Sequence, residues 1–209
     1  MAAQLIMLSR WDARSEPLVD PMAGGGTIPI EAAGLAVGAA IRRPPDLPFR
    51  YLAAFDGLPA ATPDLFPGTV PRILALDVEA ENIPIMVGNL RAAGLTGASH
   101  ETSIVIGQKD VRGLTPHFVA GMLPGAADMH PGVLCFNPPY GVRIGAEKGE
   151  AKLLDLYADL GRALGRFRGW RAACFVANPR FVEAFGHFPA MTKPATNAEL
   201  PGQFLVYEL

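Results

Sequence analysis

The sequence predicts an α/β protein whose doubly wound, mostly parallel β-sheet is covered by helices on both faces. The first observation behind this prediction is that short apolar runs alternate with longer helical patterns along the chain. The second is that these runs are rich in apolar residues, which is typical of strands buried between two layers of helices. Because crossovers between parallel strands are right-handed, a doubly wound sheet is the simplest topology for this order.

Apolar runs predict the strands, and the segments between them predict the helices. The strand candidates are Pro17–Asp20, Arg72–Asp77, Ser103–Ile106, Val133–Phe136, Ala172–Val176 and Phe204–Tyr207. The helix candidates are Thr27–Ala40, Glu79–Ala93, Lys152–Phe167 and Pro179–Phe185. Two segments break this alternation. Residues 42–71 are rich in proline and are expected to form an insertion with little regular structure, and residues 113–132 have no clear periodicity.

Length and composition indicate one globular domain over residues 1–209. Half of the residues are hydrophobic and 18% are charged, which is typical of a packed chain and not of a disordered one. No apolar run is long enough to span a membrane, and the first residues lack the features of a secretory signal. Cys135 and Cys174 are isolated, so we expect no disulfide framework, no metal site and a cytoplasmic location.

A glycine-rich loop, Asp20-Pro-Met-Ala-Gly-Gly-Gly-Thr27, joins the first strand to the first long helix. Glycines allow a sharp turn and a close approach to a ligand, and the helix beyond them offers free N–H groups. The packed glycines do not have the spacing of a dinucleotide site, and Asp20 would repel a diphosphate. The same carboxylate would attract a sulfonium cofactor that carries an ammonium group. The alternative is a glycine-rich turn that binds nothing.

Two further acids follow the next two strands. Asp77 ends the second strand, where a carboxylate can accept both hydroxyls of a ribose, although it could also cap the following helix. Asp110 follows the third strand and could accept from an adenine amino group while the Val111 N–H donates to the ring. Alone, Asp110 would be read as a turn residue. Three acids after three successive strands together favour a ligand that contains a nucleoside.

The fourth strand runs into Asn137-Pro138-Pro139-Tyr140. The two prolines fix the backbone and remove two N–H groups, so this loop presents carbonyl oxygens. The Asn137 side-chain oxygen and the Pro138 carbonyl can accept both hydrogens of an exocyclic NH₂, which localises its lone pair for attack on a methyl group. Tyr140 offers a ring on which a base can stack. Catalysis would then rest on positioning and electrostatics, with no metal. The alternative is a proline-rich turn after a buried strand.

With these motifs in place, the chain resembles the methyltransferase domain of the THUMP-associated RNA guanine-N2 methyltransferases, bacterial enzymes acting on ribosomal RNA and tRNA. The resemblance covers nearly the whole chain and is carried by WDARSEPLVDPMAGGGTIPIEAA, LDVEAENIPIMVGNLRAAGL, NPPYGVRIG, LYADLGRALGRFRGWRAACFVANP and TKPATNAELPGQFLVYEL. It implies a Rossmann-like sheet of about seven strands and S-adenosylmethionine as cofactor. Small residues differ from the usual pattern at Ala23 and Gly25, where we expect them to be tolerated.

The resemblance also implies which residues form the site. It assigns the target amine to Asn137, Pro138, Pro139 and Tyr140, and the cofactor to Asp20, Gly24, Gly26, Thr27, Asp77, Asp110 and Asn137. Their neighbours Met22, Ala23, Val78 and Val111 are expected to contact the cofactor as well.

The expected function is methyl transfer to an exocyclic base nitrogen, with guanine N2 of ribosomal RNA or tRNA preferred. Adenine N6 in DNA or RNA is an alternative, because guanine and adenine both present an exocyclic NH₂ to the loop. A protein glutamine amide is a third possible acceptor, and a non-catalytic cofactor-binding subunit is an alternative of another class. The chain is expected to lack the THUMP domain of its relatives, and its net charge is −2. We therefore expect a separate domain or subunit to help in binding the RNA.

Overall fold

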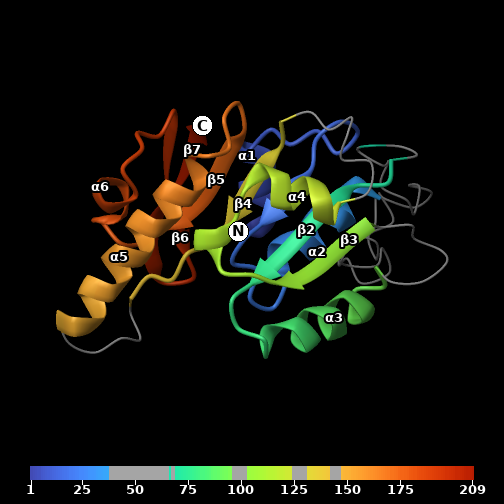
Figure 1. The fold of residues 1–209 in the computed structure, drawn as a ribbon, viewed down its shortest axis with the longest axis horizontal. Helices are drawn as coiled ribbons and strands as arrows, with labels where there is room; N and C mark the ends of the chain where they lie inside the picture. The colour runs from blue at the N-terminus through green and yellow to red at the C-terminus, as the bar shows by residue number, and fades with distance from the viewer. Residues whose placement is uncertain (38–65, 67–68, 96–102, 124–130, 142–146) are drawn as a thin grey trace, which may run out of the picture.

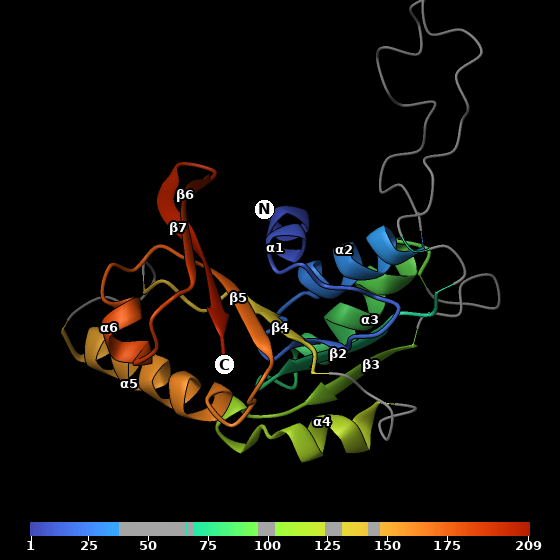
Figure 2. The ribbon, with the colours of Figure 1, turned by 90° about the horizontal axis from the view of Figure 1, so that it is seen from above.

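The computed structural model describes residues 1–37, 66, 69–95, 103–123, 131–141 and 147–209. Its centre is a seven-stranded sheet between two layers of helices, with α1, α2 and α3 on one face and α4, α5 and α6 on the other (Figures 1 and 2). The strands are β1 (Leu18–Asp20), β2 (Arg72–Asp77), β3 (Ser103–Gln108), β4 (Val133–Phe136), β5 (Arg171–Val176), β6 (Met191–Asn197) and β7 (Leu200–Glu208). The helices are α1 (Ala2–Leu8), α2 (Thr27–Ala36), α3 (Asn82–Ala92), η4 (Val111–Gly113), α4 (Pro116–Met122), α5 (Glu147–Leu164) and α6 (Phe181–Phe185).

The strand order reverses beside β1, and this reversal places the site. The order across the sheet is β3-β2-β1-β4-β5-β7-β6, and β1 pairs in parallel with both β2 and β4. The chain therefore builds the sheet outward on one side of β1 and then returns to β4 on its other side. In open sheets of this kind, ligands bind where the order reverses, outside the carboxyl ends of the strands. The loops after β1 and β4 both leave from this edge.

The last two strands make the sheet mixed. β7 runs antiparallel between β5 and β6, with Arg171 opposite Glu208 and Val176 opposite Gln203. The last strand in the chain, β7, thus lies between the parallel strand β5 and the edge strand β6. This arrangement confirms the predicted doubly wound, mostly parallel sheet of about seven strands.

Neighbouring residues of each central strand enter different halves of the core. Val19 packs with the cluster under α5 and α6, and Leu18 packs with the cluster under α1 and α2. Leu74 and Ile73 divide in the same way on β2. All four of these side chains have an exposed fraction of 0%. Burial on both faces explains why the strands are uniformly apolar in sequence.

Every predicted strand is present, with end shifts of a few residues, and the four predicted helices correspond to α2, α3, α5 and α6. Four elements were not predicted: helices α1, η4 and α4 and strand β6. Helix α4 has seven residues, too few for a clear period, and begins after Thr115, whose hydroxyl accepts from the Phe118 N–H at 3.1 Å. Strand β6 is largely exposed and contains Pro194, which an edge strand tolerates. Helix α1 precedes all the motifs considered.

The predicted proline-rich insertion falls mostly outside the described residues. Positions 42–65 and 67–68 belong to the segments that are not described, as do residues 38–40 of the first predicted helix. The prediction of little regular structure there stays a prediction. Phe66 is described, and its ring lies 6.1 Å from that of Trp11.

Candidate active site

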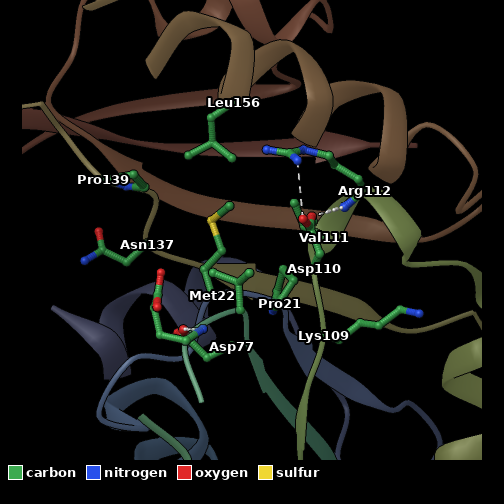
Figure 3. Close-up of a pocket in the computed structure, with 12 residues that line it drawn as sticks. Pro21, Met22, Asp77, Lys109, Asp110, Val111, Arg112, Asn137, Pro139 and Leu156 are labelled. Carbon is green, nitrogen blue, oxygen red and sulfur yellow. Dashed lines mark hydrogen bonds and ion pairs between the residues drawn. The ribbon is translucent and has the colours of Figure 1, made fainter. Parts of the chain in front are cut away.

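Two adjoining pockets open at the carboxyl ends of β1, β2 and β4. The larger has a volume of 460 Å³, and its lining includes Asp77, Asp110 and Val111. The smaller has a volume of 290 Å³, and its lining includes Asp20 and Gly24. Met22 and Asn137 line both pockets, so the boundary between the two lies at these side chains. Figure 3 shows Met22 in the middle of the larger pocket, with Asn137 and Pro139 on one side and Asp110, Val111 and Arg112 on the other.

The glycine loop folds tightly over the end of β1. Gly24 and Gly26 have φ angles of 52° and 83°, a region that L side chains rarely adopt. The Ala23 N–H donates to the Leu76 carbonyl at 2.8 Å, which fixes the loop to the neighbouring strand β2. A Cβ on Gly24 would have no atom within 4 Å, so glycine is needed there for its backbone angle. At Gly26 a Cβ would also lie 3.1 Å from Met86 Cγ.

Asp20 is a buried acid at the floor of the smaller pocket. Its exposed fraction is 1%, and its carboxylate accepts from the Met22 N–H at 3.0 Å. Burial raises the pKa of Asp20 to about 8; the Met22 hydrogen bond lowers this pKa and the charge of Asp77 raises it. A carboxylate with so little hydration is stabilised by a cationic ligand, and an ammonium group matches it in charge and size.

Asp77 connects the end of β2 to the glycine loop. One carboxylate oxygen accepts from the Gly24 N–H at 2.7 Å, and the other accepts from the Glu79 N–H at 2.9 Å and from Asn82 Nδ2 at 3.0 Å. Helix α3 has Glu81 at its N-cap position, so Asp77 is not the N-cap residue that the alternative interpretation required. A carboxylate has about four acceptor positions, so Asp77 can still accept from a ligand hydroxyl in the pocket.

Asp110 is a turn residue that also lines a pocket, and its contact with an adenine stays a prediction. It caps the short helix η4 by accepting from the Arg112 N–H at 2.9 Å, and its other oxygen lies 3.5 Å from the Arg112 guanidinium. It also lines the larger pocket beside Val111. Arg112 Nε in turn donates to Asp159 at 2.9 Å, so the wall that carries Asp110 is bound to helix α5.

The loop after β4 places Asn137 where the pockets meet. The Tyr140 hydroxyl donates to Asn137 Oδ1, and the Tyr140 ring stands edge-on to Phe175 with centroids 5.7 Å apart. Burial raises the pKa of Tyr140, whereas hydrogen bonds with the Asn137 and Asn197 side chains lower it. The Pro139 carbonyl accepts from the Tyr157 hydroxyl. Tyr140 lines neither pocket, so its predicted stacking on a base stays a prediction.

Most of the residues assigned from sequence are brought together, although they come from four separate segments. The assigned residues around the larger pocket are Met22, Asp77, Val78, Asp110, Val111, Asn137 and Pro139. Those around the smaller pocket are Asp20, Met22, Ala23, Gly24, Thr27 and Asn137. Gly26, Pro138 and Tyr140 line neither pocket; Gly26 caps α2 and Pro138 is buried.

Several lining residues were not assigned from sequence. The smaller pocket is lined by Met1 at the N-cap of α1, by Ala2 and Leu5 of α1 and by Phe175 of β5, and Leu156 of α5 lines the larger one. They are apolar and offer no reactive or hydrogen-bonding side chain, so only the packing of distant elements reveals them as part of a pocket wall. Lys109 and Arg112 also line the larger pocket, and their position within two residues of Asp110 was the available signal.

The described part of the chain holds neither a cluster of metal-ligating side chains nor a helix that could span a membrane. No group of three or more His, Cys, Asp and Glu side chains gathers there in a way that could hold a metal ion. No helix in those same ranges has the length and apolar character needed to cross a bilayer.

Comparisons with known proteins agree with this geometry. The protein family described as "RMKL-like, methyltransferase domain" matches residues 1–205. Ribosomal RNA large subunit methyltransferase K/L of Allochromatium vinosum is 32% identical over 204 residues, which cover 89% of this chain and 25% of that protein. The chain thus spans about a quarter of the length of this curated relative.

Two solved structures have the same fold. SMU.472, solved in complex with SAH, superposes with a TM-score of 0.76 at 24% identity, over 100% of this chain and 52% of that one. TrmN of Thermus thermophilus superposes with a TM-score of 0.63 at 19% identity, over 99% of this chain and 47% of that one.

Proposed function

Because the chain belongs to the family of RMKL-like methyltransferase domains, we propose that it transfers a methyl group from S-adenosylmethionine to an exocyclic nitrogen of an RNA base, with guanine N2 preferred. The observation that carries this proposal is the meeting of two pockets at Asn137, one with Asp77 and Asp110 and the other with Asp20. A cofactor with a nucleoside half and an amino-acid half needs two such compartments beside the reacting atom.

The residues present fit this cofactor. Asp20 is buried with one backbone hydrogen bond, so the ammonium group of the amino-acid half would neutralise its charge. Asp77 would accept from the ribose, and Asp110 with the Val111 N–H would contact the adenine in the larger pocket. When bound, S-adenosylmethionine supplies a methyl group on a positively charged sulfur. SAH, present in the SMU.472 structure, is the same molecule without that methyl group, which supports this choice of cofactor.

The protein's own part in the reaction is to hold and orient the amine. Asn137 Oδ1 and the Pro138 carbonyl accept the two amine hydrogens, which keeps the nitrogen lone pair out of conjugation with the ring. The amine then needs no base to remove a proton before it attacks, so positioning and electrostatics supply the catalysis. Since Oδ1 has two lone pairs, it can accept from the Tyr140 hydroxyl and from the amine together.

The substrate is proposed from the relatives and from the resemblance in the catalytic motifs. The A. vinosum relative is named for ribosomal RNA, which supports RNA as the substrate class. We assign catalysis to one domain over residues 1–209 and place the reaction in the cytoplasm, where such RNA is made and modified. With a net charge of −2, the chain is proposed to depend on another domain or subunit for RNA affinity.

The test is to incubate the protein with methyl-labelled cofactor and total RNA, DNA or protein, followed by digestion and chromatography of the products. Label in N2-methylguanosine supports the proposal. Label in N6-methyladenine would contradict it and support adenine as the acceptor. Label in methylglutamine would contradict it and support a protein acceptor. Absence of label from all three, with the cofactor bound, would support a non-catalytic cofactor-binding subunit.

Replacing Asn137 tests the division of roles within the site. Asn137→Ala is expected to lower the rate of transfer at least about 100-fold, because one of the two acceptors of the amine is lost. Calorimetric titration with S-adenosylhomocysteine should give an affinity close to that of the wild type. Asn178→Ala is the control, since Asn178 follows β5 at the same sheet edge but lines neither pocket. Equal loss of transfer and of cofactor affinity in Asn137→Ala would contradict these roles.

A further inference from the structure

Tyr157 contacts the loop after β4, although the sequence alone assigns it no role in the site. It lies on α5 with an exposed fraction of 1%, and its hydroxyl donates to the Pro139 carbonyl at 2.5 Å. Its ring packs edge-on against Phe181 of α6, with centroids 4.8 Å apart. The ring is thus held by the core of the molecule, and the hydroxyl extends from that core to the backbone beside Asn137.

The loop cannot hold itself in place by its own N–H groups. Pro138 and Pro139 have none, so the backbone of these two residues can only accept hydrogen bonds, through their carbonyl oxygens. Of their two carbonyls, that of Pro139 accepts from Tyr157, and the described residues offer no hydrogen bond to that of Pro138. The Tyr157 hydroxyl therefore fixes one carbonyl and leaves the adjacent one available to a ligand.

Helix α5 contacts the loop at a second point one turn away. Gly141 follows the loop with a φ of 83°, and a Cβ there would lie 2.7 Å from Leu153 Cδ2. Leu153 and Tyr157 are four residues apart and therefore lie on the same face of the helix. On the other side of the loop, Tyr140 packs against Phe175 of β5. The loop is thus packed between α5 and β5.

We infer that Tyr157 is a positioning residue of the active site: by fixing the Pro139 carbonyl, its hydroxyl directs the Pro138 carbonyl toward the target amine. This inference rests on the proposed function, because the amine is the group that the Pro138 carbonyl would hold. Tyr157 lines neither pocket and so acts through the loop, without contact with substrate or cofactor.

A second buried tyrosine provides a matched control. Tyr207 of β7 has an exposed fraction of 0%, and its hydroxyl has no hydrogen-bond partner within the described part of the chain. Tyr157→Phe and Tyr207→Phe each remove one oxygen from a buried ring and keep the volume of the core. Only the first removes a hydrogen bond to the loop, so the pair separates loop positioning from core packing.

The experiment compares both variants with the wild type in steady-state methylation and in cofactor titration. Tyr157→Phe is expected to lower kcat about 10-fold, because the transition state loses the stabilisation that about one hydrogen bond provides. KM for RNA and affinity for S-adenosylhomocysteine should stay at wild-type values, because ground-state contacts are retained. Tyr207→Phe should leave all three quantities unchanged. A wild-type kcat in Tyr157→Phe would overturn the inference.

Backbone hydrogen exchange gives a readout that does not depend on turnover. The amides of Tyr140 and Gly141, the first N–H groups after the two prolines, should exchange faster in Tyr157→Phe than in Tyr207→Phe. Equal exchange in the two variants would mean that Tyr157 does not hold the loop. If the wild type methylates nothing, the proposed function fails, whereas the exchange measurement still decides whether Tyr157 fixes this backbone.

Discussion

At the scale of single residues, the site contains an acid whose ionisation opposes folding. Asp20 follows two fully buried apolar residues at the end of β1 and is itself 1% exposed. Burial raises its pKa to about 8, so the folded protein binds this proton more tightly than the unfolded chain, where the ordinary value is 3.8. The stability that comes from this tighter binding is fully present below about pH 4 and is lost as the pH rises through about 8. A cationic ligand would remove this penalty.

Asp20→Asn should therefore separate stability from binding. The variant is expected to unfold at a higher temperature than the wild type at pH 8, by a free-energy difference on the order of a few kcal/mol, because asparagine carries no charge to bury. Below about pH 4 this advantage should vanish, since Asp20 is protonated there in both states. Thermal unfolding between pH 4 and pH 8 measures this, and identical melting temperatures of both proteins at every pH would contradict it.

The same variant should bind the cofactor more weakly. Loss of the carboxylate is expected to weaken binding of S-adenosylhomocysteine at least about 10-fold, because a charge-assisted contact with its ammonium group is lost. Isothermal titration at pH 8 measures the affinity. An unchanged affinity would mean that Asp20 does not face the ammonium group.

At the scale of elements, helices α5 and α6 approach each other through a glycine. A Cβ placed on Gly161 of α5 would lie 1.8 Å from the Phe185 carbonyl oxygen at the end of α6. The His187 ring also lies 3.0 Å from the Gly161 carbonyl. This close approach keeps α6 on α5, and α6 supplies the Phe181 ring that packs against Tyr157.

Gly161→Ala should consequently disrupt the packing of these helices. We expect a loss of about 3 kcal/mol or more in the free energy of unfolding, because backbone atoms must move to make room for the methyl group. Gly88→Ala is the control: Gly88 lies exposed in the middle of α3 with nothing within 4 Å of its added Cβ. That change should stabilise the protein by about 0.5–1 kcal/mol through helix propensity. Urea unfolding measures both, and equal effects would refute the packing argument.

The elements also indicate what a sequence can reveal. Strands β2 and β4 were predicted with their observed bounds, since every residue in them except Arg72 is buried whichever face it points to. Helix α4 and strand β6 were missed, because a seven-residue helix has too few turns for a period and an exposed edge strand needs no apolar pattern. The order of apolar and polar residues thus predicts those strands and helices whose residues are buried in a regular pattern.

At the scale of the whole molecule, the site joins segments that are distant in sequence. Motifs found the acids and the Asn-Pro-Pro-Tyr loop, and the predicted family resemblance is confirmed by the match over residues 1–205. Motifs could not find the walls that α1, β5 and α5 contribute, because Leu5, Phe175 and Leu156 are ordinary core residues whose place depends on tertiary packing. The polar residues of the proposed site can therefore be predicted from sequence, whereas the apolar walls of its pockets cannot.

One arginine connects the N-terminal segment to the sheet. Arg171 of β5 donates through Nε to the Ser9 carbonyl at 2.9 Å and through an Nη to the Arg10 carbonyl at 3.1 Å. It also binds the Glu16 carboxylate at 2.7 Å, and both side chains of this pair are largely buried. Since α1 precedes Ser9 directly and lines the smaller pocket, Arg171 holds a wall of that pocket.

Arg171→Ala should therefore affect both stability and cofactor binding. We expect a loss of about 1–3 kcal/mol in the free energy of unfolding, because several charge-assisted hydrogen bonds disappear and Glu16 stays unpaired. Affinity for S-adenosylhomocysteine should fall as well, since α1 loses an anchor. Arg168→Ala, at an exposed position, is the control. Thermal unfolding and titration measure the two effects, and lower stability with full cofactor affinity would exclude α1 from the binding pocket.

The antiparallel insertion of β7 matters for synthesis on the ribosome. Six residues of β5 pair with β7, from Arg171 opposite Glu208 to Val176 opposite Gln203, although β7 is made after β6 and well after β5. Until β7 leaves the exit tunnel, a nascent chain presents the open side of a strand whose centre, Ala172 to Phe175, is fully buried in the finished protein. Unpaired apolar edges of this kind pair with other chains, so we expect the growing polypeptide to be most prone to aggregation in this interval.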